Sequence, residues 1–334
     1  MATPKVSIIM SVYNGETYLS EAIESILNQT LSNYEFIIIN DGSTDYTGEI
    51  LREYKHKKII LIENHKNIGL TKSLNKGLSI AKGEYIARMD ADDISLPDRL
   101  EKQAAFLDGN EHIKIIGCWF DEIDIHGQKI RTNKAKTSTV LIRWRLLFGN
   151  AFGHSTIMFR KNGHGSPLYD ESFKYGQDYE LWSRLCWKWN GANIPEVLVQ
   201  WRVNDNSISS KRKEAHKNIR EIISRNNLAM ILGEISYNDL SDFHSFYGSS
   251  GKNISLEDLI RITKKINRLK LYFLAKFKFK KKERNILDSE IVTQTINLLI
   301  SSHETITKKI FFLVKWLISI RPNIFHVVNG YFLR

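Results

Sequence analysis

The sequence predicts an α/β fold, in which a mostly parallel central sheet flanked by helices is followed by an α-helical carboxy-terminal region. From Lys5 to about residue 110, short apolar runs alternate with stretches of helical period, which is typical of β-α-β units. The runs at 36–39 and 59–62 are continuously apolar, as buried parallel strands are. After about residue 210 only helical patterns remain. We therefore expect two parts, residues 1–210 and 211–334.

The apolar pattern places each element of the first part in order. We expect strands at 6–13, 34–40, 59–63 and 85–89, with helices at 16–27, 45–54 and 70–81 between them. The next helix should begin after Ser95, which can cap it, with Pro97 in its first turn, and end near Leu107. Beyond it we expect a strand at 113–120, a helix at 138–147, a strand at 155–160 and a helix at 178–190.

Composition limits the classes of partner and the compartment. Lys and Arg number 48 against 37 Asp and Glu, so part of the surface favours phosphates, nucleic acid or acidic lipid. The two cysteines, Cys118 and Cys186, lie too far apart for a zinc or redox motif, which favours a reduced cytoplasmic compartment. The first residues read as a strand, not a signal peptide, and no window holds the roughly 20 apolar residues of a membrane span. We expect a cytoplasmic protein, soluble or peripheral on the inner face of the plasma membrane.

Polar clusters follow three of the expected strands. They occupy residues 11–14, 40–45 and 90–93. In open α/β sheets the ligand lies beyond the carboxyl ends of the strands, so three such clusters on one edge predict a binding site. A dinucleotide fingerprint would require a G-x-G-x-x-G pattern after the first strand, where this chain has only Gly15. Hydride chemistry is therefore disfavoured.

The Asp90-Ala91-Asp92 spacing suggests a cation site. Two carboxylates on alternate positions at a strand end can hold Mg²⁺ or Mn²⁺, which would neutralise a leaving diphosphate. The alternative is a solvated acidic turn that caps the next helix.

Asp41 and Tyr13 can serve a nucleobase. A carboxylate at a strand end can accept a hydrogen bond from the imide N–H of uracil, and a tyrosine ring can stack on the base. The alternatives are that Asp41 and Asp45 form a turn that caps the next helix, with Ser43 or Thr44 also capping, and that Tyr13 packs in the core.

Asp178 is the candidate general base. It lies in the expected first turn of a helix whose Leu181, Trp182 and Leu185 can face the core, and a rigid helix end can hold a base against an incoming hydroxyl. The alternative is an acidic residue that only complements the helix dipole.

Together these motifs resemble the family 2 glycosyltransferases of the GT-A fold, over about residues 4–210. The match follows the family's order and spacing. Its parts are residues 6–14 (VSIIMSVYN), 40–45 (NDGSTD), 67–70 (NIGL), 83–93 (GEYIARMDADD), 154–156 (HST), 177–178 (QD) and 201–203 (WRV). The resemblance implies the nucleotide-diphospho-sugar transferase fold and activity.

The resemblance also implies residue roles. Asp41 would contact the base, Asp90 and Asp92 would serve the ribose, diphosphate and metal, and Asp178 would be the catalytic base. The expected donor site comprises Val12, Tyr13, Asp41, Asn67, Lys72, Arg88, Asp90, Ala91, Asp92 and Arg202. Asp92 would ligate Mn²⁺ or Mg²⁺, with Asp90 and His154 as further candidate ligands.

The chain departs from the family pattern at two positions. Leu74 precedes Asn75 where many relatives have arginine, so a base or phosphate contact is expected at Lys72 or Arg88 instead. Gln177 precedes Asp178 where many relatives have glutamate, which leaves the base in place but removes a charge that would tune its pKa.

Two further residues have alternative roles. A lone histidine at a strand start, such as His154, is often structural rather than a metal or diphosphate contact. Arg202 and residues 207–210 resemble the family's flexible stretch over the donor phosphates, and the alternative is a polar linker.

The carboxy-terminal part combines basic and apolar residues. A capping box at 255–258 begins one of four or five expected helices. The basic and aromatic tract 276–284 and the amphipathic stretch 306–320 suggest attachment to an anionic membrane, where a lipid-linked acceptor would lie. The alternative is a helical subdomain that packs on itself or forms a homodimer. No RNA-binding or helix-turn-helix signature accompanies the basic residues, so nucleic acid is not an expected partner.

The expected function is inverting transfer of a sugar from a UDP-sugar to a hydroxyl of a glycan acceptor in bacterial O-antigen or capsule synthesis, and we expect this acceptor to be lipid-linked. A metal-dependent phosphatase would also use a D-x-D pair, but after the first strand, where this chain has Ser11, Val12 and Tyr13. A non-enzymatic nucleotide or glycan binder is the other alternative, because Gln177 departs from the usual site.

Overall fold

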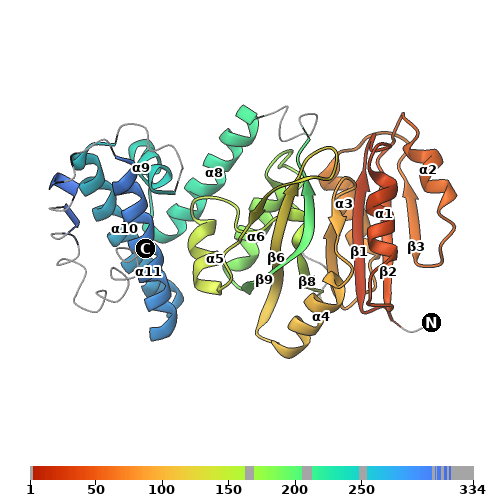
Figure 1. Ribbon diagram of the computed structural model, residues 1–334, viewed down its shortest axis with the longest axis horizontal. Coiled ribbons are helices and arrows are strands. Elements are labelled where there is room, and N and C mark those ends of the chain that lie inside the picture. Colours follow the sequence, from red (N-terminus) through yellow and green to blue (C-terminus); the bar gives the residue numbers. More distant parts are fainter. Residues whose placement is uncertain are drawn as a thin grey trace. The chain divides into compact units, whose positions relative to one another are not determined.

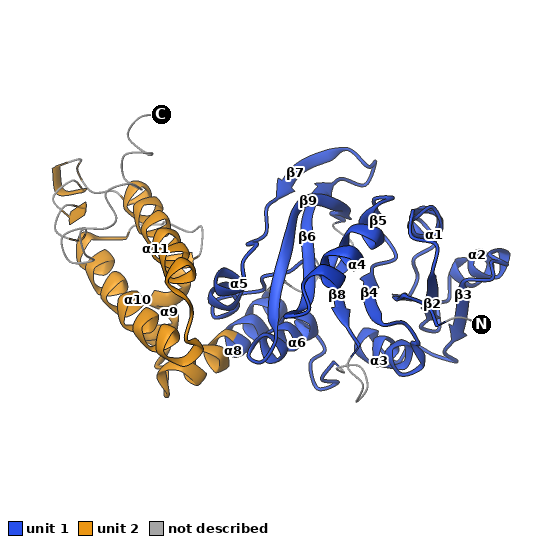
Figure 2. Ribbon diagram, turned by 90° about the horizontal axis from the view of Figure 1, so that it is seen from below, with its two compact units in different colours: residues 1–223 blue, residues 224–334 orange. Residues whose placement is uncertain are grey.

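The computed structural model describes residues 3–161, 169–204, 213–247 and 254–302, with residues 305, 307–309, 312, 313 and 316 (Figure 1). Two compact units make up the chain, residues 1–223 and 224–334 (Figure 2). The expected boundary between residues 210 and 211 lies outside the described residues. Each unit is therefore considered by itself.

The first four strands form the parallel half of the sheet in unit 1. They are β1 (Val6–Val12), β2 (Tyr34–Asn40), β3 (Ile59–Glu63) and β4 (Tyr85–Met89), in the spatial order β3-β2-β1-β4. All three pairings are parallel. The sequence predicted these strands to within one residue, because buried parallel strands have an unbroken apolar pattern.

The rest of the nine-stranded sheet is mixed. β8 (Met158–Arg160) runs antiparallel to β4 and to β6 (Ile113–Ile123), whereas β9 (Asn190–Arg202) runs parallel to β6. β5 (Ile94–Ser95) pairs with β9, and β7 (Lys129–Asn133) pairs with β6. The sequence pattern did not predict β5, β7 or β9. β5 has only two residues, β7 is mostly exposed, and exposed residues interrupt β9, so none of the three forms a continuous apolar run.

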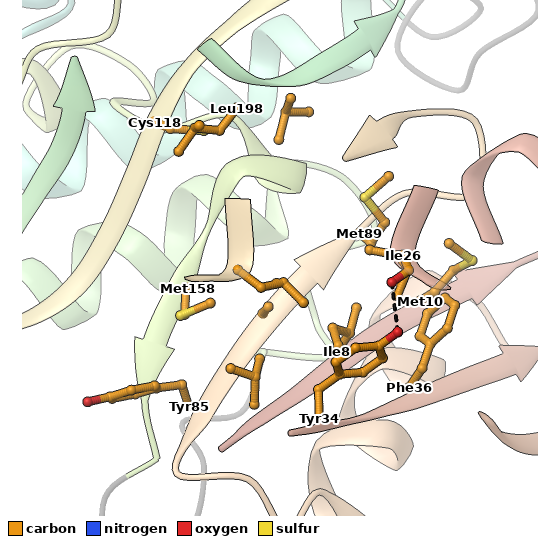
Figure 3. Packing of buried hydrophobic residues seen from close by; sticks show 14 of the residues in the cluster. Ile8, Met10, Ile26, Tyr34, Phe36, Tyr85, Met89, Cys118, Met158 and Leu198 are labelled. Atoms are coloured by element: carbon orange, nitrogen blue, oxygen red, sulfur yellow. Dashed lines mark hydrogen bonds between the residues drawn. The ribbon is translucent and has the colours of Figure 1, made fainter. Parts of the chain in front are cut away.

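Helices cover both faces of the sheet. Ile8 and Met10 of β1 face a core that includes α1 (Leu19–Leu27) and α4 (Arg99–Gly109), and in this core the Tyr34 hydroxyl donates to the Ile26 carbonyl at 2.8 Å (Figure 3). Ile9, the alternate residue, faces the opposite core. That second core is formed with α3 (Leu70–Ile80), α5 (Thr139–Leu146), α6 (Gln177–Cys186) and Ile223. The short α2 (Thr47–Glu53) follows β2.

Five expected boundaries in unit 1 are wrong by about three residues or more, among them the start of α1, which is Leu19, and the end of β6, which is Ile123. The helix expected after Ser95 begins at Arg99, because Ser95 belongs to β5 and pairs with Val199. The strand expected from residue 155 begins at Met158, after a 3-10 turn, η1 (His154–Thr156). The helix expected to reach residue 190 ends at Cys186, because β9 begins at Asn190.

Unit 2 is helical throughout its described part. α8 (Lys213–Leu232) crosses the boundary between the units, followed by α9 (Tyr237–Tyr247), α10 (Leu256–Phe277) and α11 (Lys281–Ser301). The capping box is confirmed, since Ser255 accepts the backbone N–H of Asp258 and the Asp258 side chain accepts that of Ser255. Most of residues 306–320 lies outside the described residues.

The basic and aromatic tract, residues 276–284, covers the end of α10, the turn at 278–280 and the beginning of α11. Phe279 is buried and its ring lies near those of Phe273 and Phe277. The aromatic residues of the tract therefore contribute to the helical core, and its lysines remain outside. No helix in the described part of the chain has the length and apolar character needed to cross a membrane.

Candidate functional site

The carboxyl ends of β1, β2 and β4 lie at one edge of the sheet, because these strands are parallel. Val12 pairs with Asn40, and Met10 pairs with Met89. Beyond the strands, the backbone N–H of Asp41 donates to the Val12 carbonyl at 2.8 Å. The three polar clusters expected from the sequence are therefore neighbours.

The Asp41 carboxylate connects β2 to the beginning of α3. It is 2% exposed; Oδ1 accepts from the Asn64 side chain at 2.8 Å and from the Ile68 N–H at 3.0 Å, and Oδ2 accepts from the Gly69 N–H at 2.9 Å. Gly69 precedes α3 and has a φ of 95°, which favours glycine. Asp41 therefore anchors the start of α3, and does not cap the helix that directly follows β2.

The loop after β2 contacts the loop after β1. Asn14, at a φ of 50°, donates its backbone N–H to the Ser43 hydroxyl at 3.0 Å and accepts the Thr44 N–H at 2.9 Å. The expected capping of α2 by Ser43 or Thr44 is therefore wrong. Asp45 instead accepts the Thr47 N–H at 3.1 Å, so the acidic residue of this loop serves the helix start.

Three expected donor contacts have exposed side chains on this edge. Tyr13 is 48% exposed, so the alternative that it packs in the core is wrong. Asn67 and Lys72 are exposed on either side of Gly69. A ring and two polar side chains are thus available to a ligand that lies over the start of α3.

The acidic cluster after β4 is organised by Ser155 of η1. The Ser155 hydroxyl lies 2.6 Å from Oδ2 of Asp90 and also bonds to Oδ2 of Asp93. Asp93 is fully buried, and its Oδ1 accepts the backbone N–H of Arg202 at 2.9 Å. In the described part of the chain, no other residue donates to the Asp92 carboxylate, which is partly exposed. Asp93 thus joins this loop to β9, while Asp92 is left available.

The three carboxylates differ in pKa. Burial, aided by the charge of Asp90, raises the pKa of Asp92 to about 6. Burial likewise raises the pKa of Asp93 well above its ordinary value. For Asp90, burial acts in the same direction but is outweighed by the Arg88 charge and the Ser155 hydrogen bond, so its pKa is lowered. A cation at Asp90 and Asp92 would offset the repulsion between them.

The donor set fits a cation that also binds substrate phosphates. Across the ranges that the structure describes, no three His, Cys, Asp or Glu side chains converge to hold a metal ion. Mg²⁺ commonly binds through one or two carboxylates, with phosphate oxygens and water completing its shell. Asp90 and Asp92 fit that mode, and they do not fit an all-protein metal cage.

Arg88 lies behind the acidic cluster. It is buried on β4, and its Nη2 donates to Asp90. Its Nε and Nη1 are buried and have no hydrogen-bond partner within the described residues. Each such unpaired N–H costs about 1–3 kcal/mol. The cost marks Arg88 as a residue retained for the charge it places beside Asp90.

His154 belongs to an aromatic cluster. Its Nε2 lies 2.8 Å from the Tyr169 hydroxyl, and its ring contacts that of Trp182 edge-on. Burial and the Arg88 charge lower the pKa of His154 to about 3, so the imidazole is neutral at physiological pH. With Nε2 engaged, only Nδ1 remains for a ligand, which weakens the expectation that His154 holds a metal.

Asp178 enters the site from the start of α6. Gly176 precedes the helix at a φ of 66°, and a Cβ there would lie 2.9 Å from Ile219, so glycine is required. The Asn150 side chain donates to Oδ2 of Asp178 at 2.7 Å. Burial raises the pKa of Asp178, and the negative charge of Asp90 adds to the shift. A carboxylate held in this way has the electrostatics of a general base.

Arg202 is buried among protein acceptors. Its guanidinium donates to the backbone carbonyls of Asp92 and Asp124 at 3.0 and 3.1 Å and to the carboxylate of Glu21, and it lies over the Tyr18 ring. These contacts assign Arg202 a scaffold role in this structure, which is neither the expected phosphate contact nor a polar linker. Residues 207–210 lie outside the described residues.

Sequence reasoning did not assign a role to three residues of this site. Asn150 precedes η1 in a loop without a motif, and Tyr169 is one apolar residue among many. Ser155 lies within a family motif, but its bonds to two aspartates depend on β8 and β4 being neighbours. The contacts of these three residues produce no repeating pattern in the sequence from which they could be predicted.

Comparison with known proteins identifies the relatives of this chain. The family described as Glycosyl transferase family 2 matches residues 7–165. An uncharacterised glycosyltransferase of Haemophilus influenzae is 36% identical over 244 residues, which cover 70% of this chain and 76% of that protein. The O-antigen biosynthesis glycosyltransferase WbnJ of Escherichia coli is 34% identical, with 60% of this chain and 81% of WbnJ covered.

A solved structure shares the fold. The crystal structure of S. aureus TarS residues 1–349 in complex with UDP-GlcNAc has a TM-score of 0.57 and 17% identity, covering 92% of this chain and 89% of that one. The expected fold, a GT-A domain followed by several helices, is confirmed.

Proposed function

The chain belongs to glycosyl transferase family 2, and from this premise we propose that it moves a sugar from a UDP-sugar to a hydroxyl of a glycan acceptor with inversion at the anomeric carbon. It is a glycosyltransferase. The observation that carries the finer proposal is that one short segment, residues 150–155, contacts both carboxylates: Ser155 bonds to Asp90 at 2.6 Å and Asn150 bonds to Asp178 at 2.7 Å. Donor and base chemistry would then share one site.

Uridine is proposed to lie over the start of α3. Oδ2 of Asp41 accepts only the Gly69 N–H among the described residues, so it retains capacity for the imide N–H of uracil. The exposed ring of Tyr13 would stack on the base, while Val12, Asn67 and Lys72 border the same edge. The UDP and UDP-GlcNAc complexes of TarS support a uridine donor.

The diphosphate is proposed to lie at Asp90, Ala91 and Asp92. These carboxylates would hold Mn²⁺ or Mg²⁺, and the bound cation would neutralise charge on the leaving diphosphate. Arg88 keeps Asp90 ionised and fixes its position. His154 remains a candidate contact through Nδ1.

Asp178 is proposed to take the proton of the acceptor hydroxyl. The acceptor oxygen then forms a bond to the anomeric carbon as the bond to the diphosphate breaks on the opposite face, which inverts that centre. Asn150 holds Oδ2 of Asp178, leaving Oδ1 for the hydroxyl. The raised pKa brings this base closer to neutral pH, where proton transfer is more effective.

The acceptor is proposed to be a glycan of a bacterial surface polysaccharide, such as O-antigen or capsule. The similarity to WbnJ supports this class of product. A lipid-linked acceptor would place the enzyme at the inner face of the plasma membrane as a peripheral protein.

A panel of UDP-sugars tests the proposal. A true donor should raise the melting temperature in a metal-dependent manner, because a ligand that binds only the folded state stabilises it. The same sugar should release UDP when an acceptor glycan is supplied. Stabilisation without UDP release from any acceptor would favour a binding protein, and release of inorganic phosphate would favour a phosphatase.

A further inference from the structure

Helix α10 presents two different faces. Its buried face comprises Leu259, Ile262, Thr263, Ile266, Leu269 and Phe273. The opposite face comprises Ile260, Lys264, Arg268, Leu271 and Tyr272, which we call the outer stripe. Residues separated by three, four or eleven positions lie on one side of a helix, so the outer stripe is a continuous surface.

The apolar members of the outer stripe are exposed. Ile260 is 38% exposed, Leu271 is 66% exposed and Tyr272 is 49% exposed. Single exposed apolar residues are ordinary on protein surfaces, whereas several on one face of one helix indicate an interaction surface.

The cations of α10 form two groups, those on the flanks of the helix, which form ion pairs, and those on the outer stripe. On the flanks, Arg261 and Lys265 both pair with Asp242, and Lys270 pairs with Asp288. On the outer stripe, Lys264 and Arg268 form no ion pair with any residue that the structure describes. Flank charges thus stabilise unit 2, and outer-stripe charges do not.

The positive charge continues beyond the outer stripe. The exposed Glu257 lies on the same face, three residues before Ile260, and from Ile260 to Phe277 α10 contains no acidic residue. Lys278 follows α10, and Lys281 and Lys282 begin α11; all three are exposed and likewise have no ion pair in the described part of the chain. From Ile260 to the beginning of α11, the surface therefore combines apolar and aromatic side chains with cations that form no ion pair with a described residue.

We propose that the outer stripe of α10, together with these three lysines, docks the protein onto an anionic lipid surface. Lipid headgroups supply the opposing charge that the lysines and Arg268 lack. Ile260, Leu271 and Tyr272 can then enter the boundary between headgroups and acyl chains, where tyrosine is favoured. The surface lies in unit 2, so the proposal does not depend on the donor chemistry proposed for unit 1.

A second copy of the chain fits this surface less well. A two-fold interface brings the same patch of each subunit together. Lys264 and Arg268 would then face the same cations of the partner, and on this face of the described helix only Glu257 could offset them. Charge complementarity favours the membrane.

Vesicle co-sedimentation of the full chain tests the proposal. Wild type should bind vesicles of phosphatidylcholine and phosphatidylglycerol at 3:1, and should bind pure phosphatidylcholine far more weakly. The double variant Lys264→Glu, Arg268→Glu should weaken binding by at least about 30-fold, which corresponds to roughly 1 kcal/mol per cation. Leu271→Ser with Tyr272→Ser should weaken it by about tenfold or more.

The matched control is Lys55→Glu with Lys57→Glu. These exposed lysines lie in unit 1, and their replacement changes the net charge equally. The control should change vesicle binding by less than about threefold. Circular dichroism and melting temperature should be unchanged in all three variants, because each replaced side chain is exposed.

Three results would overturn the proposal. One is that wild type does not bind anionic vesicles. Another is that the outer-stripe variants bind them as tightly as the control does. The third is a dimer, seen by sedimentation velocity, that the Leu271→Ser, Tyr272→Ser variant abolishes while vesicle binding persists, which would make the outer stripe a dimer interface.

Discussion

Two aspartates, one in each unit, differ in their surroundings and have opposite pKa shifts: Asp93 is fully buried beside other carboxylates, and Asp242 is less deeply buried beside two cations. Asp93 in unit 1 bonds to the Ser155 hydroxyl and to a backbone N–H, and burial raises its pKa. Asp242 in unit 2 accepts from Arg261 at 3.0 Å and from Lys265 at 2.6 Å. There burial acts to raise the pKa, but the two cations outweigh it and the pKa is lowered. The charge of the partner, and not burial alone, decides which carboxylate stabilises its fold.

The units therefore use charge for different purposes. In unit 2, Arg261 and Lys265 of the next helix neutralise the charge of Asp242. Unit 1 places Asp90, Asp92 and Asp93 at one sheet edge, where Arg88 is the only cation among the described residues that forms an ion pair with one of them. An uncompensated buried charge is costly, so such a cluster is expected where a ligand supplies the missing charge. The predictions below test this contrast.

Removing the cation should have the largest effect. A chelator should abolish transfer, and added Mn²⁺ or Mg²⁺ should restore it. Asp90 and Asp92 are themselves negative, so they need a bound cation to neutralise charge on the leaving diphosphate. Asp92→Asn should remove most turnover, since a direct carboxylate ligand is lost. Glu63→Gln, at the exposed end of β3, is the control. UDP release measures each case, and full activity in excess chelator would contradict the prediction.

Asp178→Asn should lower turnover by roughly 10²–10⁴ while UDP binding remains nearly intact. The amide can still bond to the acceptor but cannot take its proton. Glu180→Gln is a matched control on the same helix, because Glu180 pairs with Arg184 at 2.7 Å. Single-turnover transfer and calorimetric UDP titration separate the effects. A collapse of donor affinity would instead make Asp178 a structural residue, and near wild-type turnover would move the search for the base to Glu180 or His154.

Asn150→Ala should lower kcat by about tenfold with little change in the KM for donor, because the bond that positions the base is lost. That hydrogen bond also lowers the pKa of Asp178 against the larger effect of burial. Its loss should raise the pKa further, so the acid limb of the rate profile should move to higher pH. Asn33→Ala, an exposed site, is the control. A uniform loss of rate at every pH would indicate only local disorder.

Asp242→Asn should destabilise unit 2 by about 1–2 kcal/mol at neutral pH, because two cations lose their partner. In the wild type the pKa of Asp242 is lower in the folded than in the unfolded state, so its contribution is present above about pH 4 and is lost as pH falls below that value. Hydrogen exchange of α9 and α10 amides measures both effects. Glu257→Gln, exposed on α10, is the control, and equal protection at pH 3 and pH 7 would contradict the prediction.

Much of unit 1 could be predicted from local pattern. β1, β2 and β4 are buried along their length and β3 is an apolar run at the sheet edge, so their positions and parallel pairing could be predicted from the apolar pattern. The polar clusters at their ends follow too, because parallel strands end at one edge. The start of α10 is equally local, since Ser255 and Asp258 cap it within one turn.

β9 and the partners of the acidic cluster could not be predicted in this way. β9 pairs with β6, about 75 residues earlier, and only that pairing brings the Arg202 N–H to Asp93. Asn150 likewise reaches Asp178 across 28 residues. Such contacts leave no periodicity, because they depend on how distant segments pack and not on which residues are adjacent.

The amino-acid sequence by itself determined which residues carry charge and at which strand and helix ends they lie, because those features depend on neighbouring residues. Tertiary structure alone decided their chemical state. The fold places Arg88 beside Asp90 and buries Arg202 among backbone carbonyls. It also raises the pKa of Asp92 to about 6. Desolvation and the Coulomb interaction act through space, so the pKa of a carboxylate depends on which distant groups the fold brings near it.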